Sequence, residues 1–108
     1  MNQTKVCLKL HRQGTSEVLA VCDKKYIGQT LHNNKIKIKI YRSFYEGNEI
    51  PIQDAFSLFK NYGNINAVGS VINYGIQRGV LNKNSVLWLE NEAGESIPHM
   101  ILFKMPPI

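Results

Sequence analysis

Long apolar runs are absent from the sequence, and their absence argues against a membrane protein. No stretch approaches the roughly 20 consecutive apolar residues that a membrane-spanning helix needs. The opening residues, MNQTKV, also lack the apolar region of a secretory signal peptide. We therefore expect a cytoplasmic protein with no membrane partner.

Metal-ligating residues are scarce as well. Two cysteines and three histidines do not make a closed zinc site at any recognised spacing, so we expect no metal and no cofactor. Cys7 and Cys22 are interpreted as small buried apolar residues with free thiols, because cytosolic disulfides are uncommon. A bridge between them on oxidation stays an alternative.

Catalytic signatures are missing too. The stretch Gly63–Gly69, GNINAVG, lacks the GK[ST] ending of a phosphate-binding loop. Pro98 fixes the approach to His99, which is the best single candidate for a functional side chain. The sequence nominates no nucleophile and orienting acid to work with it, and a hydrogen-bonded structural histidine is the competing interpretation. We therefore assign no catalytic residue and favour a non-enzymatic protein.

The length and composition of the sequence predict a single domain over residues 1–108. The length and a hydrophobic content of 44% suffice to bury a core. The expected elements follow the order ββ–β–αα–ββ. This order predicts an α+β fold, with a mostly antiparallel sheet and a helical pair packed on one face.

The first two strands are predicted to form a hairpin. Residues 5–12 and 17–23 flank Gly14-Thr15, which suits a two-residue turn that begins with glycine. In that register Cys7 lies opposite Cys22, and the larger apolar residues fall on one face.

The stretch Lys35–Tyr41, KIKIKIY, alternates strictly between lysine and isoleucine. Side chains alternate across a strand, so this pattern predicts a half-buried strand around which the core is organised. We expect its isoleucines to pack on the helices. The residues involved are Ile36, Ile38 and Ile40 against Phe56, Phe59, Val68 and Ile72.

Two helices and two further strands are expected after this stretch. Pro51 suits a first helical turn, and Gly63 suits the position just past a helix end. The expected helices cover residues 51–62 and run from 64 or 66 to 78, and the expected strands cover 84–90 and the region of 99–104.

Several short motifs then occur in a recognisable order. These are Asp23 with Gly28, FYEG at Phe44–Gly47, INAVG at Ile65–Gly69, and Pro98-His99. In this order they resemble an archaeal family described as domain of unknown function 424, over nearly the whole chain. The resemblance implies no assigned enzyme activity and an association with translation.

Charge is distributed unevenly along the chain. Residues 1–42 hold nine Lys or Arg against two acidic residues, a formal charge of +7. Residues 43–108 hold four against six, a formal charge of −2. Such asymmetry is typical of a basic surface that meets a polyanion, and a merely soluble surface is the alternative.

The row of lysines in KIKIKIY is the main functional feature. Ammonium groups two residues apart on a strand recur every ~6.6 Å, which suits contact with a phosphodiester backbone. Lysines on an edge strand also prevent aggregation, which is the alternative. The residues that we expect to contact RNA are Lys9, Lys24, Lys25, Lys35, Lys37, Lys39 and Arg42.

Two functions follow as hypotheses. The first is a non-enzymatic RNA-binding accessory protein of the translation machinery, associated with ribosomal RNA and with ribosomal proteins. The second is a small enzyme or small-molecule-binding protein, whose pocket is formed by His99, Asp23 and a helix start at Asn64–Gly69 that includes Asn66. The first needs basic residues on one face, and the second needs a concave site with perturbed titratable groups.

Overall fold

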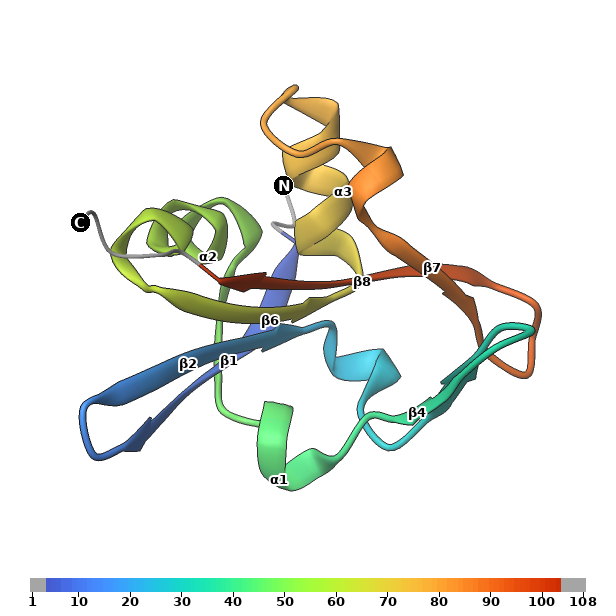
Figure 1. The fold of residues 1–108 in the computed structure, drawn as a ribbon, viewed down its shortest axis with the longest axis horizontal. Coiled ribbons are helices and arrows are strands. Elements are labelled where there is room, and N and C mark those ends of the chain that lie inside the picture. Colours follow the sequence, from blue (N-terminus) through green and yellow to red (C-terminus); the bar gives the residue numbers. More distant parts are fainter. Residues whose placement is uncertain (1–3, 104–108) are drawn as a thin grey trace.

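Eight strands in one curled sheet, with short helices on both of its faces, make up the fold of the computed structural model, which describes residues 4–103 (Figure 1). The strands are β1 (Lys5–Gln13), β2 (Ser16–Cys22), β3 (Thr30–His32), β4 (Lys37–Lys39), β5 (Asn48–Pro51), β6 (Asn64–Val68), β7 (Leu87–Glu90) and β8 (Ser96–Phe103). The helices are α1 (Arg42–Tyr45), α2 (Ile52–Ser57) and α3 (Ser70–Gln77), with single 3-10 turns η1 (Lys24–Tyr26), η2 (Leu58–Asn61) and η3 (Lys83–Ser85). No helix within residues 4–103 is long and apolar enough to cross a membrane.

The β1–β2 hairpin has the predicted register. Cys7 pairs with Cys22 and Gln13 pairs with Ser16, which leaves Gly14-Thr15 as the turn. Gly14 has a φ of 63°, as a primed hairpin turn requires. Cys7 and Cys22 are buried free thiols. Burial raises the pKa of each thiol, so both remain protonated at neutral pH.

The sheet is mixed, which corrects the expectation of a mostly antiparallel sheet. Its strand order is β4-β3-β7-β8-β6-β2-β1-β5. β2 runs parallel to β6, with Leu19 opposite Ile65 and Cys22 opposite Val68. Parallel neighbours need a long crossover connection, and the chain between these two strands supplies it. The predicted element order was therefore incomplete, because the crossover itself contains three short strands.

The stretch predicted as the start of a second helix is the strand β6. Ile65 and Ala67 lie in one core, whereas Val68 lies in the other, because β6 has strands on both sides and packing on both faces. Val68 stands three and four residues before Val71 and Ile72, which is the spacing of a helix face, so the pattern extended the predicted helix back over residues that form this strand. Gly69, with φ 96° and ψ −139°, ends the strand, and α3 begins only at Ser70.

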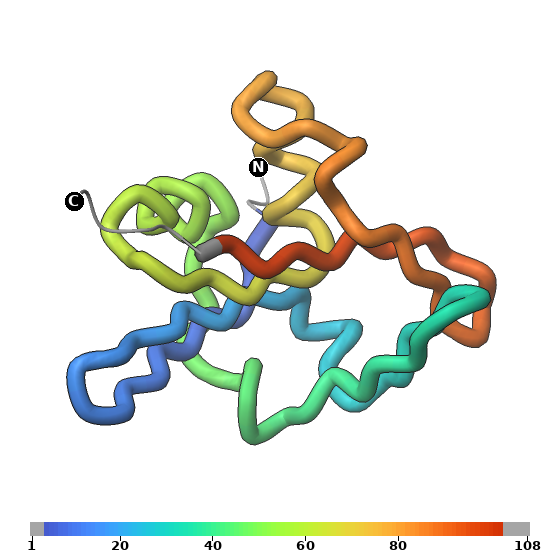
Figure 2. The backbone as a smooth tube through the Cα atoms, viewed as in Figure 1, coloured from blue at the N-terminus to red at the C-terminus, as the bar shows by residue number. Residues whose placement is uncertain are grey.

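Two cores lie on opposite faces of the sheet. The first packs under α2 and α3 and includes Val6, Leu19, Val21, Ala55, Phe59, Ile65, Ala67, Val71, Ile72, Val86 and Met100. The second consists of Ala20, Cys22, Tyr26, Leu31, Ile40, Tyr45, Val68, Leu89 and Ile97. The two ends of the sheet curl toward this second core, and α1 lies between them (Figures 1 and 2).

Ile38 and Ile40 of KIKIKIY belong to the second core, which also holds the predicted partner Val68, so the predicted packing on Phe56, Phe59 and Ile72 is wrong. Ile40 is 1% exposed and Ile38 is half-buried beside the second core, whereas Ile36 is 39% exposed. β4 is an edge strand of three residues and not the centre of the sheet. The late strands begin at Leu87 and Ser96, and the predicted end of the last one at Lys104 lies outside the described residues.

Candidate nucleic-acid interface

The β3–β4 hairpin carries Lys35, Lys37 and Lys39, and a turn at Asn33 forms its tip. The backbone N–H of Asn33 donates to the Ile36 carbonyl at 3.0 Å. Its side-chain Oδ1 accepts from the N–H groups of Lys35 at 2.7 Å and Ile36 at 2.9 Å. Asparagine favours such turns because its side chain binds backbone N–H groups close by. The turn therefore takes Lys35 and Ile36 out of the strand.

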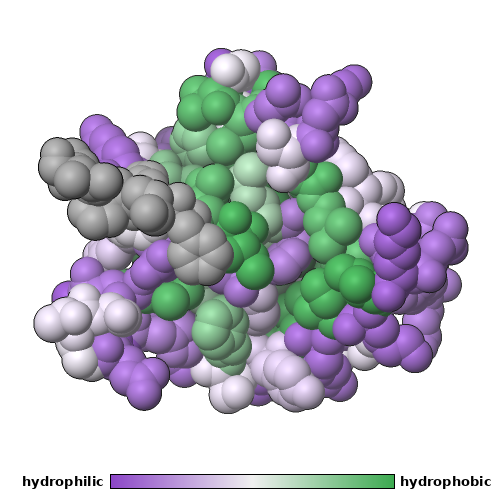
Figure 3. All heavy atoms as spheres, viewed as in Figure 1, coloured by the Kyte–Doolittle hydropathy of each residue, from purple (hydrophilic) through white to green (hydrophobic). Residues whose placement is uncertain are grey.

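Lys37 and Lys39 lie together on one face of the hairpin. Leu31 pairs with Ile38, and both face the second core. Alternation then places Lys37 and Lys39 on the opposite face, together with their partners His32 and Thr30. We call this side of β4, β3 and β7 the outer face. Figure 3 shows hydrophilic side chains gathered over this hairpin, at the right edge of the view.

The three lysines of the hairpin carry no counter-charge. Lys35, Lys37 and Lys39 are exposed, and none of them makes an ion pair within residues 4–103. Lys37 and Lys39 are separated by one residue of strand, which corresponds to the ~6.6 Å spacing expected of side chains on one face. The hairpin is therefore a compact basic site whose lysines make no ion pair among the described residues.

The other basic residues assigned to RNA are already engaged. Lys24 pairs with Glu49 at 3.5 Å, and Lys25 pairs with Glu95 at 3.6 Å. Arg42 pairs with Glu46, and the ammonium of Lys9 donates to the Ser43 carbonyl at 2.7 Å. These three ion pairs are exposed and contribute little to stability, but each one offsets a positive charge. Of the seven predicted contacts, the three in the hairpin are thus the ones without an ion pair or a side-chain hydrogen bond among the described residues.

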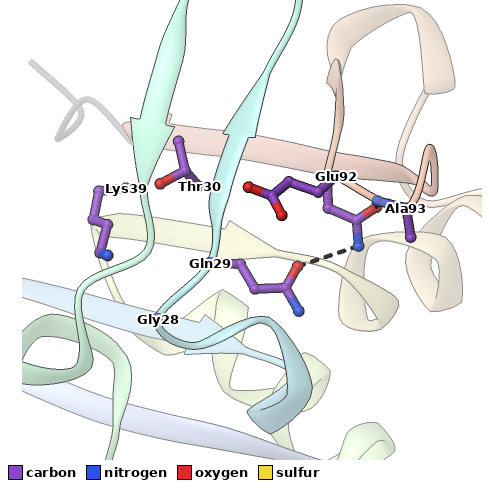
Figure 4. A pocket seen from close by; sticks show the side chains of 7 residues that line it. Gly28, Gln29, Thr30, Lys39, Glu92 and Ala93 are labelled. Atoms are coloured by element: carbon purple, nitrogen blue, oxygen red, sulfur yellow. Dashed lines mark hydrogen bonds between the residues drawn. The ribbon is translucent and has the colours of Figure 1, made fainter.

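A polar cavity of about 530 Å³ lies at the base of this hairpin. It is lined by Gly28, Gln29, Thr30, Lys39, Asn91, Glu92 and Ala93. Figure 4 shows Lys39 and Thr30 on the hairpin side and Glu92 on the loop side, and the Asn91 amide donates to Gln29 Oε1 at 3.2 Å. The cavity can hold a polar group. Within the described residues, no cluster of three or more His, Cys, Asp or Glu side chains could hold a metal ion.

The loop beside the cavity is fixed by a second set of hydrogen bonds. Asn91 Oδ1 accepts from the N–H groups of Ala93 at 3.1 Å and Glu95 at 2.9 Å. The Tyr26 hydroxyl donates to Glu95 at 2.7 Å, and this bond is the main cause of the lowered pKa of the Glu95 carboxyl. The loop that carries Glu92 is therefore held against the hairpin base by buried and half-buried polar contacts.

His99 and Asn66 do meet, but in a buried network. The Tyr45 hydroxyl donates to Asn66 Oδ1 at 2.6 Å, and His99 Nε2 donates to the same oxygen at 3.3 Å. His99 is 7% exposed, and desolvation lowers the pKa of its imidazole, so the ring is neutral at neutral pH. Neither residue lines the cavity beside Lys39. The predicted pocket at His99 and a helix start is corrected accordingly, because Asn64–Gly69 forms β6 and its end.

Asp23 forms a second buried contact, with Ser70. The Asp23 carboxylate accepts from the Ser70 hydroxyl at 2.5 Å and from its N–H at 3.2 Å. Burial raises the pKa of this carboxyl, and the two bonds from Ser70 oppose the rise. An acidic side chain at the start of α3 satisfies a backbone N–H that has no partner within the helix. Asp23 is therefore a capping residue in this fold.

The sequence did not identify Trp88, His32 or Asn34 as surface residues of interest. Trp88 is 39% exposed and lies on the outer face. The sequence signal was that Trp88 and Glu90 stand two residues apart in the expected strand and so share a face. Only the pairing of Glu90 with His32 shows that this face continues onto the β3–β4 hairpin.

Comparison with known proteins identifies the family and the fold. The family model described as "Protein of unknown function (DUF424)" matches residues 11–105. A crystal structure of an uncharacterized conserved protein from Methanopyrus kandleri is similar, with 24% sequence identity, 96% of each chain covered and a TM-score of 0.65. No functionally curated protein matches the chain. The chain therefore belongs to the DUF424 family of proteins of unknown function.

Proposed function

We propose that this protein is a non-enzymatic RNA-binding accessory protein of the translation machinery, which associates with ribosomal RNA in the cytoplasm. The observation that supports the proposal is the β3–β4 hairpin, where Lys35, Lys37 and Lys39 lie exposed without an acidic partner among the described residues. Lysine side chains bind phosphates as flexible point charges, and phosphate contact accounts for most non-specific affinity for nucleic acid. Ribosomal proteins are the further partners in this proposal.

The edge position of β4 supports a second role for the same lysines, as protection against strand-to-strand aggregation. The two roles make different predictions. Protection alone makes the lysine variants aggregate without any change in affinity for RNA, whereas phosphate binding makes affinity fall together with its salt dependence.

The test is sedimentation of a gentle lysate on a sucrose gradient, together with titration of the purified protein against ribosomal RNA over a range of salt. Changing Lys35, Lys37 and Lys39 to Gln should flatten the salt slope of affinity by ~2–3 units, because each phosphate contact contributes ~0.7–0.9. The unaltered protein should migrate with a ribosomal subunit at low salt and leave it at high salt. A protein that stays at the top of a low-salt gradient, with no affinity for ribosomal RNA, contradicts the proposal.

Small-molecule binding is the second candidate, and the cavity of about 530 Å³ favours it. Its polar lining of Lys39, Glu92 and two amide side chains would select a small polar ligand. Glu92→Ala should abolish such binding and leave affinity for RNA unchanged or slightly higher, since a carboxylate repels phosphates.

A further inference from the structure

Trp88 lies on the same outer face as Lys37 and Lys39. Glu90 pairs with His32 across β7 and β3, and His32 pairs with Lys37 across β3 and β4. Residues directly opposite in an antiparallel pair point to the same face. Trp88, two residues before Glu90, shares that face because side chains alternate along a strand. A continuous path therefore leads across the outer face from the indole to the lysines.

The indole is fixed in place and still accessible. Its Nε1–H donates to the Lys83 carbonyl at 3.1 Å, and the buried Pro98 is its cross-strand partner. The side chain nevertheless remains 39% exposed. A hydrogen-bonded indole N–H, a buried cross-strand neighbour and an open ring surface together make an aromatic side chain that offers a rigid platform.

A small pocket of about 250 Å³ adjoins this ring. It lies where β3 and β7 separate, because these strands pair only at His32 and Glu90. Its lining consists of His32, Asn33, Asn34, Trp88, Leu89, Glu90 and Ser96. Pockets for drug-sized ligands usually measure roughly 300–1,000 Å³, so this one suits a smaller, planar group.

Polar groups with free hydrogen-bonding capacity border the pocket. The Asn34 amide and the Glu90 carboxylate make no side-chain hydrogen bond or ion pair within residues 4–103. An amide can donate to and accept from the edge of a base, and a carboxylate accepts from an exocyclic amino group. Asn33, by contrast, is committed to the turn.

We propose that Trp88 and this pocket bind one unpaired base of an RNA strand whose phosphates lie along Lys37 and Lys39. The base stacks on the indole, its edge meets Asn34 and Glu90, and the flexible lysines reach the adjoining phosphates. Glu90 repels phosphate, which directs the backbone toward the lysine edge and the base toward the ring. This inference rests on the proposed function, and it names unpaired RNA rather than duplex as the ligand.

The chain contains a single tryptophan, so its fluorescence reports on this site alone. We would titrate the full chain with a single-stranded RNA oligonucleotide, an abasic oligonucleotide of equal length and a blunt RNA duplex. Single-stranded RNA should quench the emission on binding, because only an unpaired base can stack on the ring. The abasic strand should bind through its phosphates and leave the emission nearly unchanged.

Variants then test the ring itself, with labelled RNA as the readout. Trp88→Ala should weaken binding of single-stranded RNA by roughly 5- to 150-fold, the range measured for loss of one base–aromatic stack. Trp88→Phe keeps an aromatic face and should retain most of the affinity, and both variants are first checked for cooperative thermal unfolding. Val80→Ala is the control, since Val80 is 65% exposed in the loop after α3, does not line this pocket and should have no effect.

The outcomes separate the two proposals. Equal binding of single-stranded and abasic strands, with no quenching and no loss in a folded Trp88→Ala or Trp88→Phe protein, overturns base stacking and leaves phosphate binding intact. Failure of every nucleic acid to bind overturns both. Quenching by single-stranded RNA that persists after Lys→Gln changes supports stacking and contradicts the phosphate contacts.

Discussion

At the scale of single residues, the motifs behind the family resemblance meet in space. Tyr45 of FYEG donates to Asn66 of INAVG, and Asn66 also accepts from His99. Gly47 is required because a Cβ there would lie 2.3 Å from the Leu8 carbonyl oxygen. Tyr45 and His99 are buried and Asn66 is half-buried, and their polar groups bond to one another beside the second core.

Gly69 offers the sharpest test at this scale. Its φ of 96° belongs to a region that side chains rarely adopt, and a Cβ would lie 2.9 Å from Asp23 Oδ2. Gly69→Ala should therefore lower the free energy of unfolding by at least ~1–3 kcal/mol, through backbone strain and displacement of the Asp23 cap. Gly94→Ala is the control, because Gly94 has φ 78° but open space around it. Equal losses in chemical denaturation would show that the contact with Asp23 contributes nothing.

His99 gives a prediction about pH. Its folded-state pKa is lowered from 6.5 by burial, so between that lowered value and 6.5 the unfolded chain binds a proton that the folded chain does not. The contribution of His99 to the free energy of unfolding is thus fully present above pH 6.5. It declines as the pH falls below 6.5, by at most ~1.4 kcal/mol per pH unit. His99→Gln should remove this component of the pH dependence.

Comparing the wild-type protein with His99→Gln isolates the contribution of His99, because all other titratable groups are the same in the two proteins. Asp23 acts with the opposite sign, since its raised pKa makes the folded state gain protons above 3.8. Denaturation curves at several pH values from 5 to 8 provide the measurement. Parallel pH profiles for wild type and His99→Gln would mean that His99 does not supply the expected proton linkage.

At the scale of elements, the alternating stretch KIKIKIY is part turn and part strand in the β3–β4 hairpin. Ile40 is 1% exposed in the second core, whereas Ile36 is 39% exposed in the turn. Ile40→Ala should cost ~2–5 kcal/mol of unfolding free energy through lost burial and a residual cavity. Ile36→Ala, its matched control, should stay within about 0.5 kcal/mol. Similar losses for both in chemical denaturation would mean that the turn side chain is as buried as the core one.

At the scale of the whole molecule, the two halves of the chain are interleaved. β1 pairs with β5, β2 with β6 and β3 with β7, so strands of the basic half lie beside strands of the acidic half. Ion pairs between Lys24 and Glu49 and between Lys25 and Glu95 follow from this arrangement. The charge asymmetry of the sequence is therefore not a separation in space, except at the β3–β4 hairpin.

A matched set of substitutions tests this distinction. Changing Lys24, Lys25 and Arg42 to Gln removes the same charge as the hairpin variant, but from residues already paired with acids. The salt slope of RNA affinity should then fall by less than about 1 unit, against ~2–3 for the hairpin lysines. Equal changes would show that net charge, and not the hairpin, determines binding.

The local pattern of the sequence determined the first hairpin, because Gly14-Thr15 suits a two-residue turn and the register that it sets places the larger apolar residues on one face. It also indicated α2, the strand of Leu87–Glu90 and the lysines of β4. These features depend on residues close together in the chain, where turn chemistry and side-chain periodicity act directly.

Tertiary structure decided the rest. β6 is a strand because it pairs with β2 and β8 and has a core on each face, whereas the helical spacing of Val68 with Val71 and Ile72 joined its last residue to the stripe of α3. Long-range pairings decide that Lys24 and Lys25 are engaged by Glu49 and Glu95. The pairing of His32 with Glu90, 58 positions apart, brings Trp88 to the face of the hairpin lysines. Periodicity identifies which residues share a face of an element, but only the packed sheet determines what each face meets.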